Sequence, residues 1–228
     1  MNVDVLLYDG FDELDAIGPY EVFEYALESA AEGSESAAEE SSIPAGADLE
    51  PAGRLRYVTV EDRDRVTASH GTRVGVDAVL PEPDAGDAPD LLVVPGGGWT
   101  AREETASAWA EAERGAIPNA LTEYHAAGVR IASVCTGSML LATAGVTDGR
   151  RAVTHASALD ELRDSGARVV DARVVDDGDL LTAGGVTSGL DLALYIVERE
   201  FGAAVADRVA TVIEYDRRYE VADGTSGE

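Results

Sequence analysis

The sequence has no lysine, and all 17 of its basic residues are arginine. Without lysine the chain cannot form a Schiff base with a carbonyl substrate or anchor pyridoxal phosphate. It also cannot build the lysine-containing loop that binds phosphate in many nucleotide-dependent enzymes. These absences exclude three common kinds of active site.

Cysteine and histidine are also scarce, with one cysteine, Cys135, and three histidines. A single cysteine permits no internal disulfide, which is typical of a reducing cytoplasm. The start of the chain has no basic region, and no apolar run approaches membrane-spanning length. We therefore expect a cytoplasmic protein without membrane contact. The few scattered histidines and the cysteine predict no metal site and no cofactor.

Positive charge is sparse, because 44 acidic residues oppose the arginines and leave a net charge of −27. Nucleic-acid binding needs a basic surface, so no nucleic-acid partner is expected. The acids are spread along most of the chain. Such a surface is typical of proteins that work in high salt, where the Debye length falls to about 3 Å near 1 M.

Strand and helix patterns alternate along the chain. Buried strands are expected at residues 3–8, 91–94 and 129–134, and Asp177-Gly178 predicts a hairpin. The last clear helix ends before Gly202. This alternation predicts a three-layer α/β/α sandwich with a mostly parallel sheet in one domain, residues 1–221. Residues 28–53 are acidic and poor in large apolar side chains, so we expect a flexible insertion there, and a disordered tail at 222–228.

Cys135 lies at the end of an apolar run, directly before Thr136-Gly137, which open a helix. This placement holds a thiol at the carboxyl end of a sheet and over the positive end of a helix. A helix N-terminus stabilises a thiolate, so we expect the thiol pKa to be depressed and the group to act as a nucleophile. The alternative is a buried structural cysteine, which is common for this residue type.

Three glycines follow the buried strand that ends at Val94, in Pro95-Gly96-Gly97-Gly98. Taken alone, this segment is a tight turn. Together with the cysteine at a strand-to-helix turn it predicts an oxyanion site, with backbone N–H groups from Gly97 and Thr136 and with Gly98 lining it.

These features resemble the ThiJ/PfpI family of the class I glutamine amidotransferase-like superfamily, whose fold is flavodoxin-like. Six motifs carry the resemblance: residues 14–23, which begin Leu14-Asp15-Ala16-Ile17-Gly18-Pro19, residues 94–98, residues 133–138 around Cys135, residues 141–150, Thr154-His155, and residues 184–191. Within the family, the first and third motifs are most similar to isonitrile hydratases.

The resemblance implies a catalytic set and an assembly. Cys135 would be the nucleophile, Asp15 the acid beside it, and His155 a base or an orienting group, although a structural histidine is an equal alternative. Two anions in contact are unfavourable, so a proton would be shared or held by the Asp15 carboxyl. Asp12 and Glu13 would be solvated acids. The family also implies a homodimer.

The function that the resemblance implies is cysteine-dependent hydration or hydrolysis of a small molecule, such as an isonitrile converted to an N-substituted formamide. One alternative is a glyoxalase or deglycase that acts on reactive dicarbonyls. Another is a non-enzymatic, redox-responsive stress protein whose cysteine is oxidised. Similar domains occur in AraC-type regulators, which carry a DNA-binding helix-turn-helix extension. With about 25 residues after the last predicted core helix, we expect no such extension here.

Overall fold

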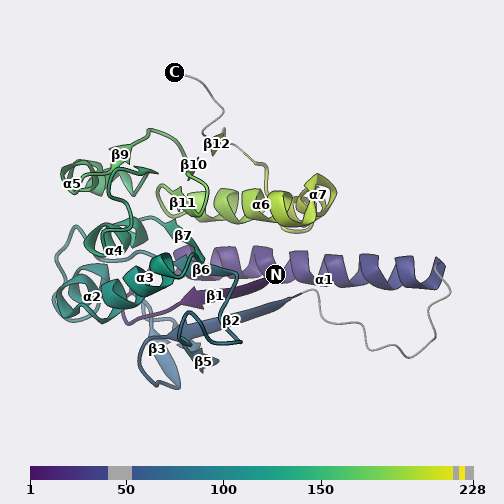
Figure 1. Cartoon of the computed structure of the whole chain (residues 1–228), viewed down its shortest axis with the longest axis horizontal. Coiled ribbons are helices and arrows are strands. Elements are labelled where there is room, and N and C mark those ends of the chain that lie inside the picture. The colour runs from purple at the N-terminus through teal and green to yellow at the C-terminus, as the bar shows by residue number, and fades with distance from the viewer. Residues whose placement is uncertain (41–52, 218–220, 224–228) are drawn as a thin grey trace.

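The computed structural model describes residues 1–40, with side chains to residue 31, and residues 53–217 and 221–223. Its centre is an eight-stranded sheet (Figure 1). Neighbouring strands are parallel except for the β10–β11 hairpin. In spatial order they are β12 (Val221–Ala222), β10 (Val174–Asp176), β11 (Leu180–Ala183), β7 (Arg130–Val134), β6 (Leu91–Val94), β1 (Asn2–Leu6), β2 (Arg54–Thr59) and β5 (Ala78–Val79).

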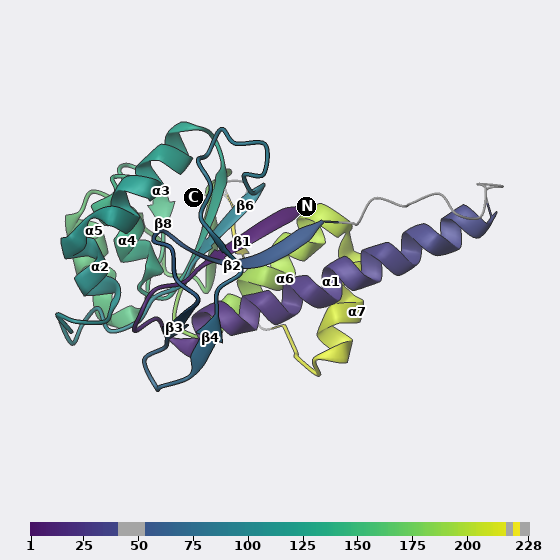
Figure 2. The same cartoon turned by 90° about the horizontal axis from the view of Figure 1, so that it is seen from below.

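Two groups of helices cover the sheet, one on each face (Figures 1 and 2). The first group contains α1 (Glu13–Glu40), α6 (Ser188–Phe201) and α7 (Ala203–Val212), which pack on one another. The second contains α2 (Ala108–Arg114), α3 (Ala116–Ala126), α4 (Gly137–Thr143), the 3₁₀ turn Ala156–Ala158 and α5 (Leu159–Asp164). This arrangement confirms the three-layer α/β/α prediction and the mostly parallel sheet.

Two small ribbons lie outside the main sheet. β3 (Arg65–Thr67) and β4 (Arg73–Gly75) form an antiparallel hairpin, and β8 (Arg151–Ala152) pairs in parallel with β9 (Arg168–Val169). The predicted turn at Asp177-Gly178 is confirmed, since it joins the antiparallel strands β10 and β11.

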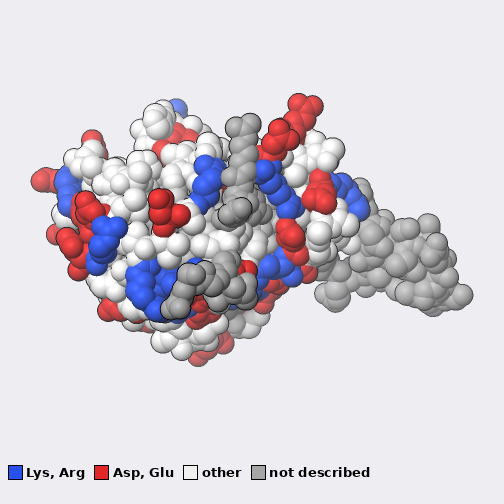
Figure 3. Space-filling view, turned by 90° about the horizontal axis from the view of Figure 1, so that it is seen from above, with Lys and Arg blue, Asp and Glu red and all other residues white. Residues whose placement is uncertain are grey.

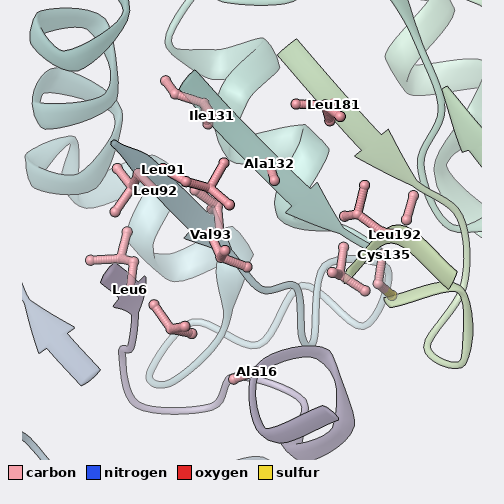
Figure 4. Packing of buried hydrophobic residues seen from close by; sticks show 14 of the residues in the cluster. Leu6, Ala16, Leu91, Leu92, Val93, Ile131, Ala132, Cys135, Leu181 and Leu192 are labelled. Atoms are coloured by element: carbon pink, nitrogen blue, oxygen red, sulfur yellow. The ribbon is translucent and has the colours of Figure 1, made fainter. Parts of the chain in front are cut away.

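The core follows the central strands. The four residues of β6, Leu91–Val94, are all buried, as expected for a strand that helices cover on both faces. Figure 4 shows Leu6 of β1, Ile131 of β7 and Leu181 of β11 in this buried layer, with Cys135 at its end. The segment that carries Cys135 therefore continues directly from the buried core.

The expectation of a loop from residue 28 was wrong over its first part. Helix α1 continues to Glu40, and its last turns extend beyond the other helices (Figures 1 and 2). Alanine and glutamate are strong helix formers, so this stretch is helical although it has few large apolar residues. Residues 41–52 of the proposed insertion lie outside the described residues.

Two elements near the C-terminus were not predicted. Gly202 ends α6 with φ 88°, but α7 begins at the next residue and packs on α6 and α1. The predicted tail was also wrong at its first residue, because Ala222 belongs to β12, which pairs in parallel with β10. Residues 224–228 of that tail lie outside the described residues. No helix within the described parts is long and apolar enough to cross a membrane.

Candidate active site

The turn at Cys135 is a strained elbow between β7 and α4. Cys135 has φ 57°, in the left-handed region that residues with a side chain rarely occupy. Its N–H donates to the carbonyls of Ala183 (3.1 Å) and Gly184 (2.8 Å), and its own carbonyl accepts from Thr154 Oγ1 at 2.9 Å. These bonds hold the thiol at the carboxyl end of β7, which confirms the predicted strand-to-helix geometry.

Asp15 reaches the same place from the first turn of α1. The side chain is fully buried, and its Oδ2 accepts a hydrogen bond from the Gly96 N–H at 3.1 Å. The Gly96 carbonyl in turn accepts from the Asp12 N–H at 2.8 Å. Gly96 thus joins the loop after β6 to the start of α1, while Asp15 Oδ1 has no hydrogen-bond partner among the described atoms.

The Asp15 carboxyl holds its proton at neutral pH. Burial, and then the negative charge of Asp12, raise the pKa of Asp15 to about 8, although the Gly96 N–H and the neighbouring thiol act in the opposite direction. A carboxyl that stays protonated at pH 7 can donate a proton to a bound molecule. The sequence analysis expected one proton to be shared or held here, and the pKa of Asp15 agrees with that expectation.

The expectation of a depressed thiol pKa was wrong. Burial and the Asp15 charge raise the pKa of Cys135 to about 12, and only 7 % of its surface is exposed. The backbone N–H groups of Thr136 and Val186 lower this pKa in part, but they do not outweigh desolvation. At pH 7 the two groups therefore form a neutral thiol–carboxyl pair, and any nucleophilic attack by this sulfur would require the thiol proton to leave.

The predicted oxyanion donors lie at the site, but in this structure each already faces an acceptor. The Gly97 N–H donates to Thr136 Oγ1 at 3.0 Å, and the Thr136 N–H faces the Cys135 sulfur. Gly98 is packed against Ser107, where a Cβ would lie 2.6 Å from the Ser107 Cβ. The oxyanion role stays a prediction.

Gly96 was missed by the sequence analysis, although it contacts both sides of the site. A Cβ on Gly96 would lie 2.4 Å from the Thr136 nitrogen, so only glycine lets the loop approach the start of α4 this closely. The signal was present in the sequence, since Gly96 is the first glycine after the buried strand. Its hydrogen bond to Asp15 depends on a partner 81 residues away in sequence.

His155 lies beside the site but contacts another partner. Among the described residues its ring nitrogens bond to Ser157 and not to Cys135 or Asp15: Nδ1 accepts from the Ser157 N–H at 3.2 Å and lies 2.8 Å from Ser157 Oγ. Because Nδ1 is an acceptor here, the proton of the neutral ring is on Nε2. The ring caps the 3₁₀ turn and packs against Gly185. A catalytic role for His155 stays a prediction.

A loop after Gly98 closes against the segment that carries His155. Trp99 Nε1 and Arg102 Nη2 each donate to Glu161 Oε2 at 2.9 Å, and Thr100 Oγ1 lies 2.7 Å from Ser157 Oγ. The Arg102 guanidinium also lies 3.6 Å above the ring centre of Trp109. These contacts hold the loop after Gly98 against the 3₁₀ turn and α5.

We had expected Asp12 and Glu13 to be solvated acids, but both carboxyls accept hydrogen bonds from the protein. Asp12 Oδ1 accepts the Leu14 N–H at 3.3 Å at the start of α1. Glu13 accepts from the His70 N–H at 3.0 Å and lies 2.8 Å from His70 Nδ1, which ties the β3–β4 hairpin to the helix. Among the described residues no three His, Cys, Asp or Glu side chains are placed to hold a metal ion.

The fold and the elbow together define an α/β protein with a cysteine at a nucleophile turn. The chain belongs to the DJ-1/PfpI family, whose model matches residues 1–199. The family resemblance in the motifs is thereby confirmed.

The chain is also similar to individual members of this family. The chain is 45 % identical to an isonitrile hydratase of Pseudomonas putida over 85 residues, 37 % of this chain and 37 % of that enzyme. It is 29 % identical to a deglycase of Thermococcus kodakarensis over 183 residues, which cover 80 % of this chain and 89 % of that protein. A ThiJ/PfpI family protein from Pseudomonas syringae superposes with TM-score 0.74 at 26 % identity, over 95 % of this chain and 76 % of the other.

Proposed function

We propose that the protein is a cysteine-dependent hydratase that converts small isonitriles to N-substituted formamides. The observation that carries this proposal is the neutral pair at the elbow. Asp15 keeps a proton at pH 7, has one carboxyl oxygen without a partner, and lies beside the Cys135 thiol. The local identity to isonitrile hydratase supports the same activity.

The neutral pair fits the first half of such a reaction. The terminal carbon of an isonitrile is attacked by sulfur and needs one proton. Cys135 forms the S–C bond while its thiol proton passes to Asp15, and the protonated carboxyl of Asp15 delivers a proton to the same carbon. The product is a thioimidate on Cys135, and the carboxyl ends the step protonated.

Water completes the second half. It adds to the thioimidate carbon, the C–S bond breaks, and the released product is the N-substituted formamide. The sulfur regains a proton, so the enzyme returns to its starting state. In this proposal the backbone N–H groups of Gly97 and Thr136 stabilise the developing oxygen charge in place of their present acceptors, Thr136 Oγ1 and the Cys135 sulfur.

The test is an assay of purified protein in molar potassium chloride with a small alkyl isonitrile. We expect formamide to accumulate, and intact-protein mass spectrometry to find the isonitrile mass added to Cys135. A Cys135→Ser variant with an unchanged melting temperature should do neither. Formamide production by the serine variant, or none by the wild type, would contradict the proposal.

A second candidate function is deglycase activity, which the deglycase match over most of both chains favours. In that reaction the Cys135 thiol would add to an aldehyde carbonyl and give a hemithioacetal. Methylglyoxal in a parallel assay separates the two: its consumption without isonitrile turnover would replace the first proposal with the second.

We also propose that the protein is a cytoplasmic homodimer. The start of α1 offers an apolar position for such a contact: Leu14 is 37 % exposed and packs beside Gly18, close to Leu190 of α6. Light scattering in molar salt should give twice the mass of the chain, and a monomeric mass would contradict the proposal.

A further inference from the structure

One buried tyrosine lies behind the site and takes no part in the reaction described above. Tyr8 follows β1 and is 4 % exposed, and its O–H donates to the carbonyl of Pro95 at 2.9 Å. The Pro95 carbonyl belongs to the same peptide group as the Gly96 N–H, which donates to Asp15 Oδ2 at 3.1 Å. One peptide group thus accepts from Tyr8 at one end and donates to Asp15 at the other.

This arrangement couples the two side chains. In a trans peptide the C=O and N–H bonds point in opposite directions, so an anchor on the carbonyl also fixes the direction of the N–H. A hydrogen bond to the carbonyl further polarises the amide and strengthens its N–H as a donor. Gly96 also lies close against the start of α4, since an added Cβ would be 2.4 Å from the Thr136 nitrogen.

We propose that Tyr8 is a positioning residue for Asp15, acting through the Pro95–Gly96 peptide group to hold and strengthen the hydrogen bond that the Asp15 carboxyl accepts. The groups that act on the pKa of Asp15 are Asp12, which precedes α1, the Cys135 thiol at the elbow, and the Gly96 N–H. Burial raises the pKa of the Tyr8 hydroxyl well above its ordinary value, and the charges of Asp15, Cys135, Glu111 of α2 and Asp12 raise it further.

The sign of the effect follows from the bond. The Gly96 N–H stabilises the ionised carboxyl and lowers its pKa, against the larger effect of burial. Removal of the Tyr8 hydroxyl weakens that donor, so the Asp15 titration should move upward by about half a pH unit. The role of Tyr8 in catalysis rests on the proposed function, but the test measures the titration of the Asp15 carboxyl directly.

The experiment is a ¹³C NMR titration of aspartate-labelled full-length protein in molar salt. Ordinary aspartates titrate near pH 4, so a carboxyl signal that titrates near pH 8 and is absent from Asp15→Asn reports Asp15. The matched control is Tyr124→Phe, because the buried Tyr124 also donates its O–H to a proline carbonyl, that of Pro81, at 2.6 Å. We expect Tyr8→Phe to raise the midpoint and Tyr124→Phe to leave it unchanged.

An unchanged midpoint in Tyr8→Phe, or an equal shift in Tyr124→Phe, would overturn the proposal. If Tyr8→Phe does not fold, the chain is instead labelled with 3-fluorotyrosine, whose hydroxyl is the stronger donor. Labelling should then lower the Asp15 midpoint in both the wild type and Tyr124→Phe, and an unmoved midpoint overturns the assignment. A protein without isonitrile activity can still pass this test, so the two proposals fail separately.

Discussion

Two carboxyl groups in the first turn of α1 have pKa values shifted in opposite directions. Asp15 faces the interior, and burial raises its pKa to about 8. Glu13 lies two residues earlier, and although burial tends to raise its pKa too, hydrogen bonds from the His70 ring and from nearby backbone N–H groups lower it to about 2. Deeper burial of Asp15, together with the larger number of donors that meet Glu13, makes the difference.

The two carboxyls also differ in the groups that they contact. Glu13 binds the β3–β4 hairpin through His70, Ser69 and Thr72. Asp15 accepts from the Gly96 N–H and lies beside the Cys135 thiol, but it is fully buried, so its ionised form is poorly stabilised. A helix N-terminus favours negative charge in general, but the local partners of each side chain decide which carboxyl keeps its proton.

The largest expected difference is in turnover. Asp15→Asn removes the proton donor and should lower kcat by about 10²–10⁴-fold, the usual contribution of a general acid. Glu13→Gln, the matched control in the same turn, should stay within about threefold of wild type, because its carboxyl faces the hairpin. Equal losses in both variants would erase the functional distinction between the two carboxyls.

The pH dependence of stability should show the same contrast. Between the unfolded pKa near 4 and the folded value of about 8, the native state holds a proton on Asp15 that the unfolded chain has lost. Stability therefore falls as pH rises through this window. At pH 8 Asp15→Asn should be more stable than wild type by about 2–5 kcal/mol.

Urea unfolding in molar potassium chloride at pH 5 and pH 8 measures this effect. The wild type and Glu13→Gln should both lose stability between the two pH values, while Asp15→Asn should lose much less. A parallel decline in all three proteins would show that another group governs the slope.

Salt should act on the surface acids and not on the buried one. Arginine and acidic side chains are interspersed on the face shown in Figure 3, but the net charge of −27 leaves many acids to repel one another. We expect the melting temperature to rise by several degrees from dilute to molar potassium chloride, since about 1 kcal/mol corresponds to about 2–4 °C at this size.

The Asp15 titration should move little over the same salt range, because buried charges are screened much less than exposed ones. Equal melting temperatures in dilute and molar salt would refute the halophilic interpretation of the composition. The Asp15 measurement is independent of that result.

The smallest effect concerns the structural carboxyl. Glu13→Gln should cost about 1 kcal/mol, because the amide accepts weaker hydrogen bonds from the hairpin. The pKa of Glu13 is lowered, so this stabilisation is present above pH 4 and is lost as pH falls through about 2. Hydrogen exchange at Val66 and Val74 should accelerate in Glu13→Gln but not in Glu21→Gln, whose side chain is exposed. Unchanged exchange would show that the hairpin needs no such anchor.

The sequence by itself determined the layers and the elbow. Uniformly apolar strands such as Leu91–Val94 and the hairpin at Asp177-Gly178 are local patterns, and so is the change from strand to helix at Cys135. The motifs also placed the chain in its family. Local patterns underestimated the length of α1. A segment of helix-forming residues without large apolar side chains has no amphipathic pattern, so its sequence resembles that of a solvated loop.

Only the tertiary structure decided the protonation of the site. The sequence placed Cys135 over a helix N-terminus, but the burial that raises its pKa depends on how α1, β11 and the glycine loop close around it. The free oxygen of Asp15 and the Tyr8–Pro95 bond likewise join residues far apart in the chain. Desolvation and hydrogen-bond partners are properties of packing, and a pattern of neighbouring residues does not contain them.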